Sequence, residues 1–354
     1  MLVSSFEKEP PMKSLMTLLC LLIGLLSLDV LAQPAPNPRL QAGGPGMRGR
    51  PNRMAPQNTF APTGDFSVVT VGTGSPEYNA ERSGPCALVQ FKGQLFLVDA
   101  GNGTQARLSE LGVPPGKFAA ILLTHHHVDH NEEFAAILLR SVLRPGTIEV
   151  IGPPKTRELV DFTLKFYQED LAYRLGRTGR SLENLGKPEV RELQGGETLA
   201  VGDVRISTAR VVHSIHTVAY RFEAGGQAIV ISGDTDYSEA LVKLAKDADI
   251  LVIDGGGAII RRNGGGGQGQ GGGAGVHAGL QSVARMAQEA GAKRLVLTHI
   301  PGNNADDEAT ARALGETYKG TVIVGRDLLE TTTEGTKAQS GKGTKGNAEE
   351  GTRH

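Results

Sequence analysis

Residues 122–130 read LLTHHHVDH, a short apolar run followed by four histidines and one aspartate. In an extended segment, His125 and His127 project to the same side, and a turn into a helix at Asn131 brings Asp129 and His130 to a second position. One metal ion cannot use four ligands so close together in the sequence, whereas two adjacent ions can. Imidazole suits zinc, and carboxylate is a natural bridge between divalent ions. The stretch therefore predicts a site for two metal ions.

The rest of the chain supplies further acids and histidines just after predicted strands. Six predicted strands each deliver an acid or an imidazole just past their C-terminal end. Open α/β sheets bind ligands outside the carboxyl ends of their strands, so we expect these side chains to meet. They are Asp99, His125, His213, Asp234, Asp254 and His299. His216 is a rival to His213 for the same place.

Short β-rich runs alternate with amphipathic stretches in the central part of the chain. Strands are predicted at 66–72, 86–91, 94–101, 119–124, 148–152, 204–212, 228–233, 250–255 and 294–299. Helices are predicted at 131–143, 156–175, 238–248 and 279–291. Enough strands for two sheets, with helices outside them, predict a four-layer αββα sandwich. We place it in a single domain over residues 64–331.

The two ends do not resemble core material. Residues 1–32 predict a secretory signal peptide, because their apolar stretch is short and is followed by small residues. A retained anchor is the alternative. Residues 33–63, rich in Pro and Gly, predict a disordered linker, and the polar residues 332–354 predict a disordered tail. The glycine-rich residues 261–275 predict a mobile loop that could act as a lid.

Composition gives weaker guidance about partners. The formal net charge is −1 and the pI about 6.8, so no global field favours nucleic acid or an anionic membrane. After removal of the signal peptide only Cys86 remains, which excludes an internal disulfide. We therefore expect an exported protein, periplasmic or secreted. No nucleic acid and no membrane beyond the signal segment is expected, and a homodimer is left open.

Five short motifs follow one another in an order that resembles the metallo-β-lactamase superfamily, specifically its ribonuclease Z/arylsulfatase-like branch. The resemblance covers about residues 66–329. The motifs are GTGSP (72–76), VDAGNGT (98–104), THHHVDH (124–130), SGDT (232–235) and LTHI (297–300). The resemblance implies the metallo-β-lactamase fold and two divalent ions.

The same resemblance assigns roles to individual residues. One ion would be held by His125, His127 and His213, and the other by Asp129, His130 and His299. Asp234 would bridge the two ions. Asp99 would orient one of the ligands and would not bind metal itself. Asp129 could also accept a proton, His277 matches a proton-handling histidine, and Asp254 resembles the acid near it. Ala278 and Gly279 follow His277 where the family often has serine or threonine, which is a departure from the family pattern.

Two adjacent divalent ions can share one water and lower its pKa towards 7. The leading prediction is therefore an exported dinuclear zinc hydrolase, in which a metal-bridged hydroxide attacks an ester, with arylsulfatase-like or phosphodiesterase-like activity. Ribonuclease Z-like RNA processing and lactone or thioester hydrolysis are alternatives. RNA processing is disfavoured because precursor tRNA is cytosolic whereas export is predicted, and because the sequence between His130 and His213 is mixed in charge. The expected substrate is therefore a small-molecule ester. A non-catalytic metal-binding scaffold or sensor is an alternative of another class.

Overall fold

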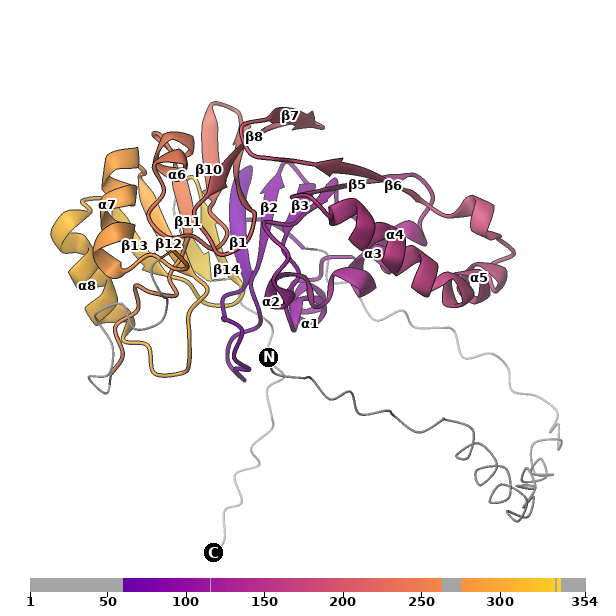
Figure 1. The fold of residues 1–354 in the computed structure, drawn as a ribbon, viewed down its shortest axis with the longest axis horizontal. Coiled ribbons are helices and arrows are strands. Elements are labelled where there is room, and N and C mark those ends of the chain that lie inside the picture. The colour runs from indigo at the N-terminus through magenta and orange to yellow at the C-terminus, as the bar shows by residue number, and fades with distance from the viewer. Residues whose placement is uncertain (1–59, 115, 263–274, 335, 339–354) are drawn as a thin grey trace, which may run out of the picture. The chain divides into compact units, whose positions relative to one another are not determined.

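Two β-sheets packed face to face form the centre of the structure, a computed structural model that describes residues 60–114, 116–262, 275–334 and 336–338 (Figure 1). Within these residues one sheet has eight strands, in the order β15 (Thr336–Ala338), β14 (Leu329–Thr332), β1 (Phe66–Gly72), β2 (Cys86–Phe91), β3 (Gln94–Val98), β4 (Ala120–Leu122), β5 (Thr147–Gly152) and β6 (Lys187–Glu192). The other has seven, in the order β13 (Thr321–Val324), β12 (Arg294–Thr298), β11 (Ile250–Asp254), β10 (Gln227–Ile231), β9 (Thr217–Ala224), β8 (Val204–Val211) and β7 (Thr198–Val201).

Helices cover the outer face of each sheet. The eight-stranded sheet is covered by α1 (Thr104–Glu110), α3 (Phe134–Val142), α4 (Thr156–Phe166) and α5 (Gln168–Gly176). The seven-stranded sheet is covered by α6 (Glu239–Leu244), α7 (Leu280–Ala290) and α8 (Asp307–Thr317). The short helix α2 (Val128–Asn131) and the 3₁₀ helix η2 (Leu182–Asn184) lie in connecting segments.

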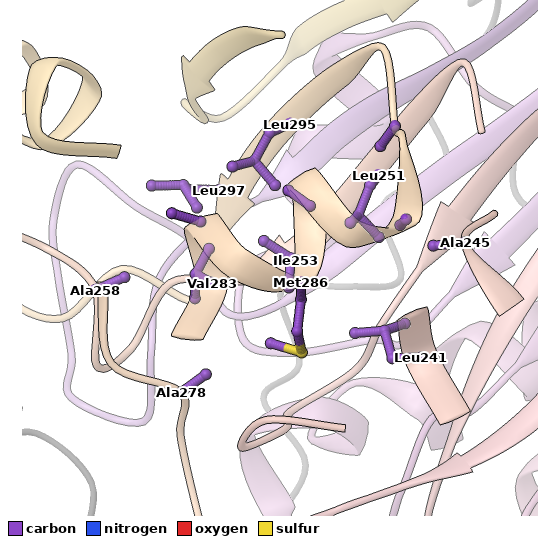
Figure 2. Packing of buried hydrophobic residues seen from close by; sticks show 14 of the residues in the cluster. Leu241, Ala245, Leu251, Ile253, Ala258, Ala278, Val283, Met286, Leu295 and Leu297 are labelled. Carbon is purple, nitrogen blue, oxygen red and sulfur yellow. The ribbon is translucent and has the colours of Figure 1, made fainter. Parts of the chain in front are cut away.

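The side-chain period of the strands produces these layers. Leu251 and Ile253 of β11 face the helices and share a buried cluster with Val283 and Met286 of α7, as Figure 2 shows. Val252, between them, points the other way into the cluster between the two sheets. Successive strand residues point to opposite faces, so a strand buried on both faces is apolar throughout. The four-layer αββα sandwich predicted from the sequence is confirmed.

Some elements differ from those predicted. The helix predicted at 156–175 is two helices, α4 and α5, which meet at Tyr167. The edge strand β6 was not predicted, because its sequence KPEVRE is largely exposed and lacks an apolar run. Strands β7, β9, β13, β14 and β15 and helices α1 and α8 were also not predicted.

Ordered structure extends beyond the predicted domain boundaries at both ends. Thr63 lies in the predicted linker, yet its backbone N–H donates to the buried Glu330 Oε1 at 3.1 Å and its hydroxyl donates to Oε2 at 2.9 Å. Strand β15 lies in the predicted tail and pairs antiparallel with β14. Backbone pairing and one buried carboxylate hold these segments, and neither leaves a strong apolar pattern in the sequence.

Several predictions fall outside the described residues and stay predictions. They concern the signal peptide, most of the linker and the tail, and the body of the glycine-rich loop, including the idea that it is a lid. In the part of the chain that is described, no helix is both long enough and apolar enough to cross a membrane.

Candidate metal centre

The strands that carry the predicted site residues end at a common edge, because β3 and β4 run parallel in one sheet and β10, β11 and β12 run parallel in the other. Asp99 directly follows β3, and His299 directly follows β12. Both have left-handed backbone conformations, with φ of 61° and 56°. Such strain in non-glycine residues tends to gather at functional sites. Both side chains are buried in the centre described below.

Three histidines and one aspartate form the first cluster. His127 Nδ1 lies 3.1 Å from His125 Nε2 and 3.2 Å from His213 Nε2. Asp234 Oδ2 lies 3.8 Å from the Nε2 atoms of both His125 and His213. The segment after β4, the end of β8 and the end of β10 therefore bring four metal-ligand groups together.

The second cluster contains Asp129, His130 and His299 and shares Asp234 with the first. His299 Nε2 lies 3.3 Å from Asp129 Oδ2 and 3.3 Å from Asp234 Oδ2. His130 Nε2 lies 3.2 Å from Asp234 Oδ1 and 3.5 Å from Asp129 Oδ2. Asp234 thus contacts members of both clusters, which is the position that a bridging carboxylate needs.

The donor sets fit divalent ions such as zinc. A tetrahedral ion with bonds of about 2.0–2.1 Å separates its ligand atoms by about 3.3 Å, close to the spacing found in both clusters. The buried His130 Nε2 also has no hydrogen-bond partner among the described residues, although it faces two carboxylates. A lone pair there would be repelled by the carboxylate oxygens unless a cation, either a proton or a metal ion, lay between them.

Asp99 and Thr124 orient one histidine of each cluster through contacts with its Nδ1 atom. Asp99 Oδ2 accepts a hydrogen bond from Thr124 Oγ1 at 2.8 Å and lies 2.9 Å from His130 Nδ1. Thr124 Oγ1 lies 3.0 Å from His125 Nδ1 and, having given its proton to Asp99, accepts from that ring. These bonds place Nδ1–H on both rings and leave Nε2 free for an ion. Thr124 was not predicted as a site residue. The signal that the sequence offered was the position of Thr124 between β4 and the first histidine.

The Asp99→Asn variant is expected to bind metal about 10–100-fold more weakly. Both oxygens of Asp99 accept hydrogen bonds, Oδ1 from the Thr124 backbone N–H at 2.8 Å and Oδ2 from Thr124 Oγ1 and His130 Nδ1, and an amide would place an NH₂ donor at one of these positions. Competition with a chelator measures the affinity of each ion. The matched control is Asp249→Asn, since Asp249 is also buried but bonds to Lys293 and the backbone of Ala228 outside both clusters. Equal affinities in the Asp99→Asn variant and the parent protein would contradict the assigned role.

The structure distinguishes the two histidines that follow β8. His213 Nδ1 donates to the carbonyl oxygen of Val276 at 2.9 Å, which turns Nε2 towards the first cluster. His216 Nε2 instead lies 3.1 Å from the carbonyl oxygen of Gln194 and belongs to neither cluster. His213 is therefore the better ligand candidate of the two.

His277 and Asp254 form a pair beside the second cluster. His277 Nδ1 lies 2.7 Å from Asp254 Oδ2, and the His277 and His299 rings stack with centroids 5.1 Å apart. Asp254 also accepts from the backbone N–H groups of Thr235 and Gly256, at 3.1 and 2.8 Å. These groups hold the Asp254 carboxylate in place, and the His277 ring beside it is half-buried.

The electrostatics of the two clusters differ. In the first, burial lowers the pKa of His125 well below its ordinary value and also lowers that of His213. These imidazoles are neutral near pH 7 and offer lone pairs. In the second, burial would lower the pKa of His299, but Asp234 and the other carboxylates outweigh it and raise that pKa to about 9. The pKa of His130 is raised for the same reason.

Proton binding therefore competes with metal binding in the second cluster. Burial opposes ionisation of Asp234, yet the charges of His299 and His130 hold its pKa well below the usual value. A divalent ion placed there displaces the histidine protons and keeps the carboxylate ionised. The roles of these residues as ligands stay predictions, although the geometry brings them all together.

Comparison with known proteins identifies the family. A family model described as "Beta-lactamase superfamily domain" matches residues 94–300. A protein named Ribonuclease Z from Mycobacterium bovis (strain BCG / Pasteur 1173P2) is 34% identical over 275 residues, which cover 74% of this chain and 96% of the relative. The similarity therefore spans nearly the whole relative.

This relative corrects the predicted partners. We expected a small-molecule ester substrate and no nucleic acid, whereas the name of the relative indicates a protein that acts on RNA. That expectation was wrong because it relied on predicted export and on the charge of the sequence, which omits the charge of the metal ions that the site would hold.

Solved structures support the same fold. The metallo-β-lactamase fold protein YhfI from Bacillus subtilis has a TM-score of 0.58 at 20% identity, with 75% of this chain and 98% of that chain covered. Human tRNase Z, short form, has a TM-score of 0.56 at 21% identity, with 75% and 99% covered. The chain belongs to the metallo-β-lactamase superfamily, in the branch that includes ribonuclease Z, and is a metal-dependent hydrolase of phosphodiester or ester bonds.

Proposed function

We propose that this protein cleaves phosphodiester bonds of RNA, with two zinc ions held by the two clusters. The observation that carries the proposal is the position of Asp234, which contacts histidines of both clusters, with His277 stacked on His299 beside them. Two adjacent ions suit in-line displacement at phosphorus, because both the attacking and the leaving oxygen need stabilisation. The relatives named Ribonuclease Z support RNA as the substrate and favour this alternative over an arylsulfatase.

When bound, the ions would supply a water of lowered pKa and polarise the phosphoryl oxygens. The protein's own residues would do the rest. Asp99, Thr124 and the Val276 carbonyl orient the imidazoles, so little reorganisation is needed when the substrate arrives. Asp129 lies at the edge of the second cluster, where it could also accept a proton. His277, held by Asp254, would give a proton to the leaving ribose oxygen through Nε2.

The pH dependence of the reaction should change in an Asp254→Asn variant. Burial lowers the pKa of His277, but the hydrogen bond and charge of Asp254 outweigh it and raise that pKa. An acid works only while protonated, so the rate falls as pH rises through its pKa. Removing the carboxylate lowers the pKa of His277, and the alkaline fall in kcat should move to lower pH. An alkaline fall at the same pH in the parent and the variant would remove His277 as the acid.

Three substrates test the proposal directly. Purified protein is given a transfer RNA precursor with a 3′ extension, and separately bis(p-nitrophenyl) phosphate and p-nitrophenyl sulfate, each with and without a chelator. The first two are the substrates of the proposed activity. We expect the protein to cleave both, to lose activity with the chelator and to regain it with zinc. Metal-dependent turnover of p-nitrophenyl sulfate without RNA cleavage would contradict the proposal. Two bound ions with no turnover of any substrate would instead favour a scaffold.

The predicted signal peptide bears on where such an enzyme meets RNA. We propose, as before, that residues 1–32 direct export, in which case the RNA is met outside the cytoplasm. Fractionation of cells that express the full chain with a C-terminal tag decides the location. Recovery of uncleaved protein in the cytoplasm would remove the export proposal and leave the proposed chemistry intact.

A further inference from the structure

His126 is the one histidine of the 124–130 stretch that lies outside both clusters, and its side chain contacts the start of α4. His126 Nε2 is 3.3 Å from Thr156 Oγ1. The fully buried Thr156 donates its hydroxyl proton to the carbonyl oxygen of Pro153 at 2.7 Å. A hydroxyl has one proton, so Thr156 accepts the hydrogen bond from His126.

The turn that receives His126 is strongly constrained. Two prolines, Pro153 and Pro154, fix their own φ angles. Lys155 follows with a left-handed backbone, φ 81°, and the Thr156 N–H closes the turn on the Pro153 carbonyl at 3.2 Å. A side chain at Gly152 would collide with the Thr156 hydroxyl. The turn therefore offers a fixed anchor point.

Among the histidines of the first cluster, His127 has the weakest support of its own. His125 is oriented by Thr124 at 3.0 Å, and His213 by the Val276 carbonyl at 2.9 Å. Among the described residues, the one hydrogen-bond contact of His127 Nε2 is with Ser214 Oγ, at 3.4 Å. His127 also has extended backbone, φ −69° and ψ 147°, at the start of α2.

We propose that His126 is a positioning residue for the first metal ion. In an extended segment, neighbouring side chains project to opposite sides, so fixing the His126 ring on one side fixes the direction of His125 and His127 on the other. Because His125 is already oriented by Thr124, the anchor acts mainly on His127. The proposal rests on the proposed metal centre and does not depend on the substrate.

Cobalt(II) provides a test that reads the ligand geometry without catalysis. The full-length metal-free protein is titrated with cobalt(II), and the visible absorption spectrum and the two dissociation constants are measured. In His126→Ala we expect one ion to bind about 10–100-fold more weakly, with an altered spectrum, as for loss of other groups that orient ligands. His126→Gln keeps a hydrogen-bond donor within reach of Thr156. It should restore most of the cobalt affinity and most of the parental spectrum.

His216→Ala is the matched control, because His216 is another histidine near the site that belongs to neither cluster; it should leave both readouts unchanged. Thermal unfolding of the metal-free variants separates positioning from stability. A lower Tm for His126→Ala with parental cobalt affinities and spectrum would overturn the proposal, as would failure of His126→Gln to restore them. A parent protein that binds two cobalt ions but does not cleave RNA overturns the proposed function alone.

Discussion

Asp234→Ala is expected to reduce the bound metal from two ions to one or none and to lower turnover by about 10³-fold, the upper range for loss of one preorganised electrostatic partner. The reason is the position of Asp234, which lies 3.8 Å from two imidazoles of the first cluster and 3.2–3.3 Å from two of the second. Removing a shared carboxylate separates the ions and leaves facing cationic groups without their counter-charge. Elemental analysis and initial rates measure the two effects.

The control for this variant is Asp249→Ala, which removes another buried aspartate of the same sheet. Asp249 pairs with Lys293 at 2.7 Å and takes no part in either cluster. It should lower stability but leave the metal content at two ions. Two ions retained in Asp234→Ala, with turnover near that of the parent, would show that Asp234 is not a bridge.

His277→Ala should have the second largest effect, and only on some substrates. A general acid contributes typically about 10²–10⁴-fold when the leaving group needs a proton. RNA cleavage, which expels a ribose oxygen, should therefore fall by that factor. Bis(p-nitrophenyl) phosphate expels p-nitrophenolate, a stable anion, and its turnover should fall far less. Metal content should stay at two ions, since His277 is bonded to Asp254 rather than needed for either predicted ligand set.

The comparison between the two substrates gives this prediction its control within one protein. Equal losses on RNA and on the activated ester would mean that His277 acts on binding or on a metal ion, not on the leaving group. An effect on a metal ion has a structural basis, since His277 lies with Asp234, Asp254 and His299 in a third group able to hold an ion. A matching loss of bound metal would then favour that effect.

The sequence predicted most inner strands of this fold, β9 excepted, because these strands are buried on both faces. ILVID of β11 and RLVLT of β12 are continuous apolar runs, and each is followed or ended by a polar site residue. The break at Tyr167 could not be predicted, because the apolar period continues across it through Val160 and Leu171, which are both buried. A periodicity that keeps its phase does not reveal a change in helix direction.

The parts of the site that sequence reasoning missed depend on long-range partners. Thr124 acts through Asp99, 25 residues away, and His126 acts through Thr156, 30 residues away. Both residues lie in the motif THHHVDH, but nothing in the motif names their distant partners, so only the folded chain reveals the contacts. The substrate class was wrong for a different reason. A formal net charge of −1 says little about whether this site attracts phosphate, because the two divalent cations that it would hold attract phosphate themselves.

The central claim is that distant segments converge to hold two neighbouring divalent ions joined by Asp234. Anomalous X-ray diffraction at the zinc absorption edge, from crystals of the zinc-loaded protein, tests it most directly. We predict two anomalous peaks about 3.5–4 Å apart, one among His125, His127 and His213, the other among Asp129, His130 and His299. A single peak, or peaks away from these side chains, would contradict the account.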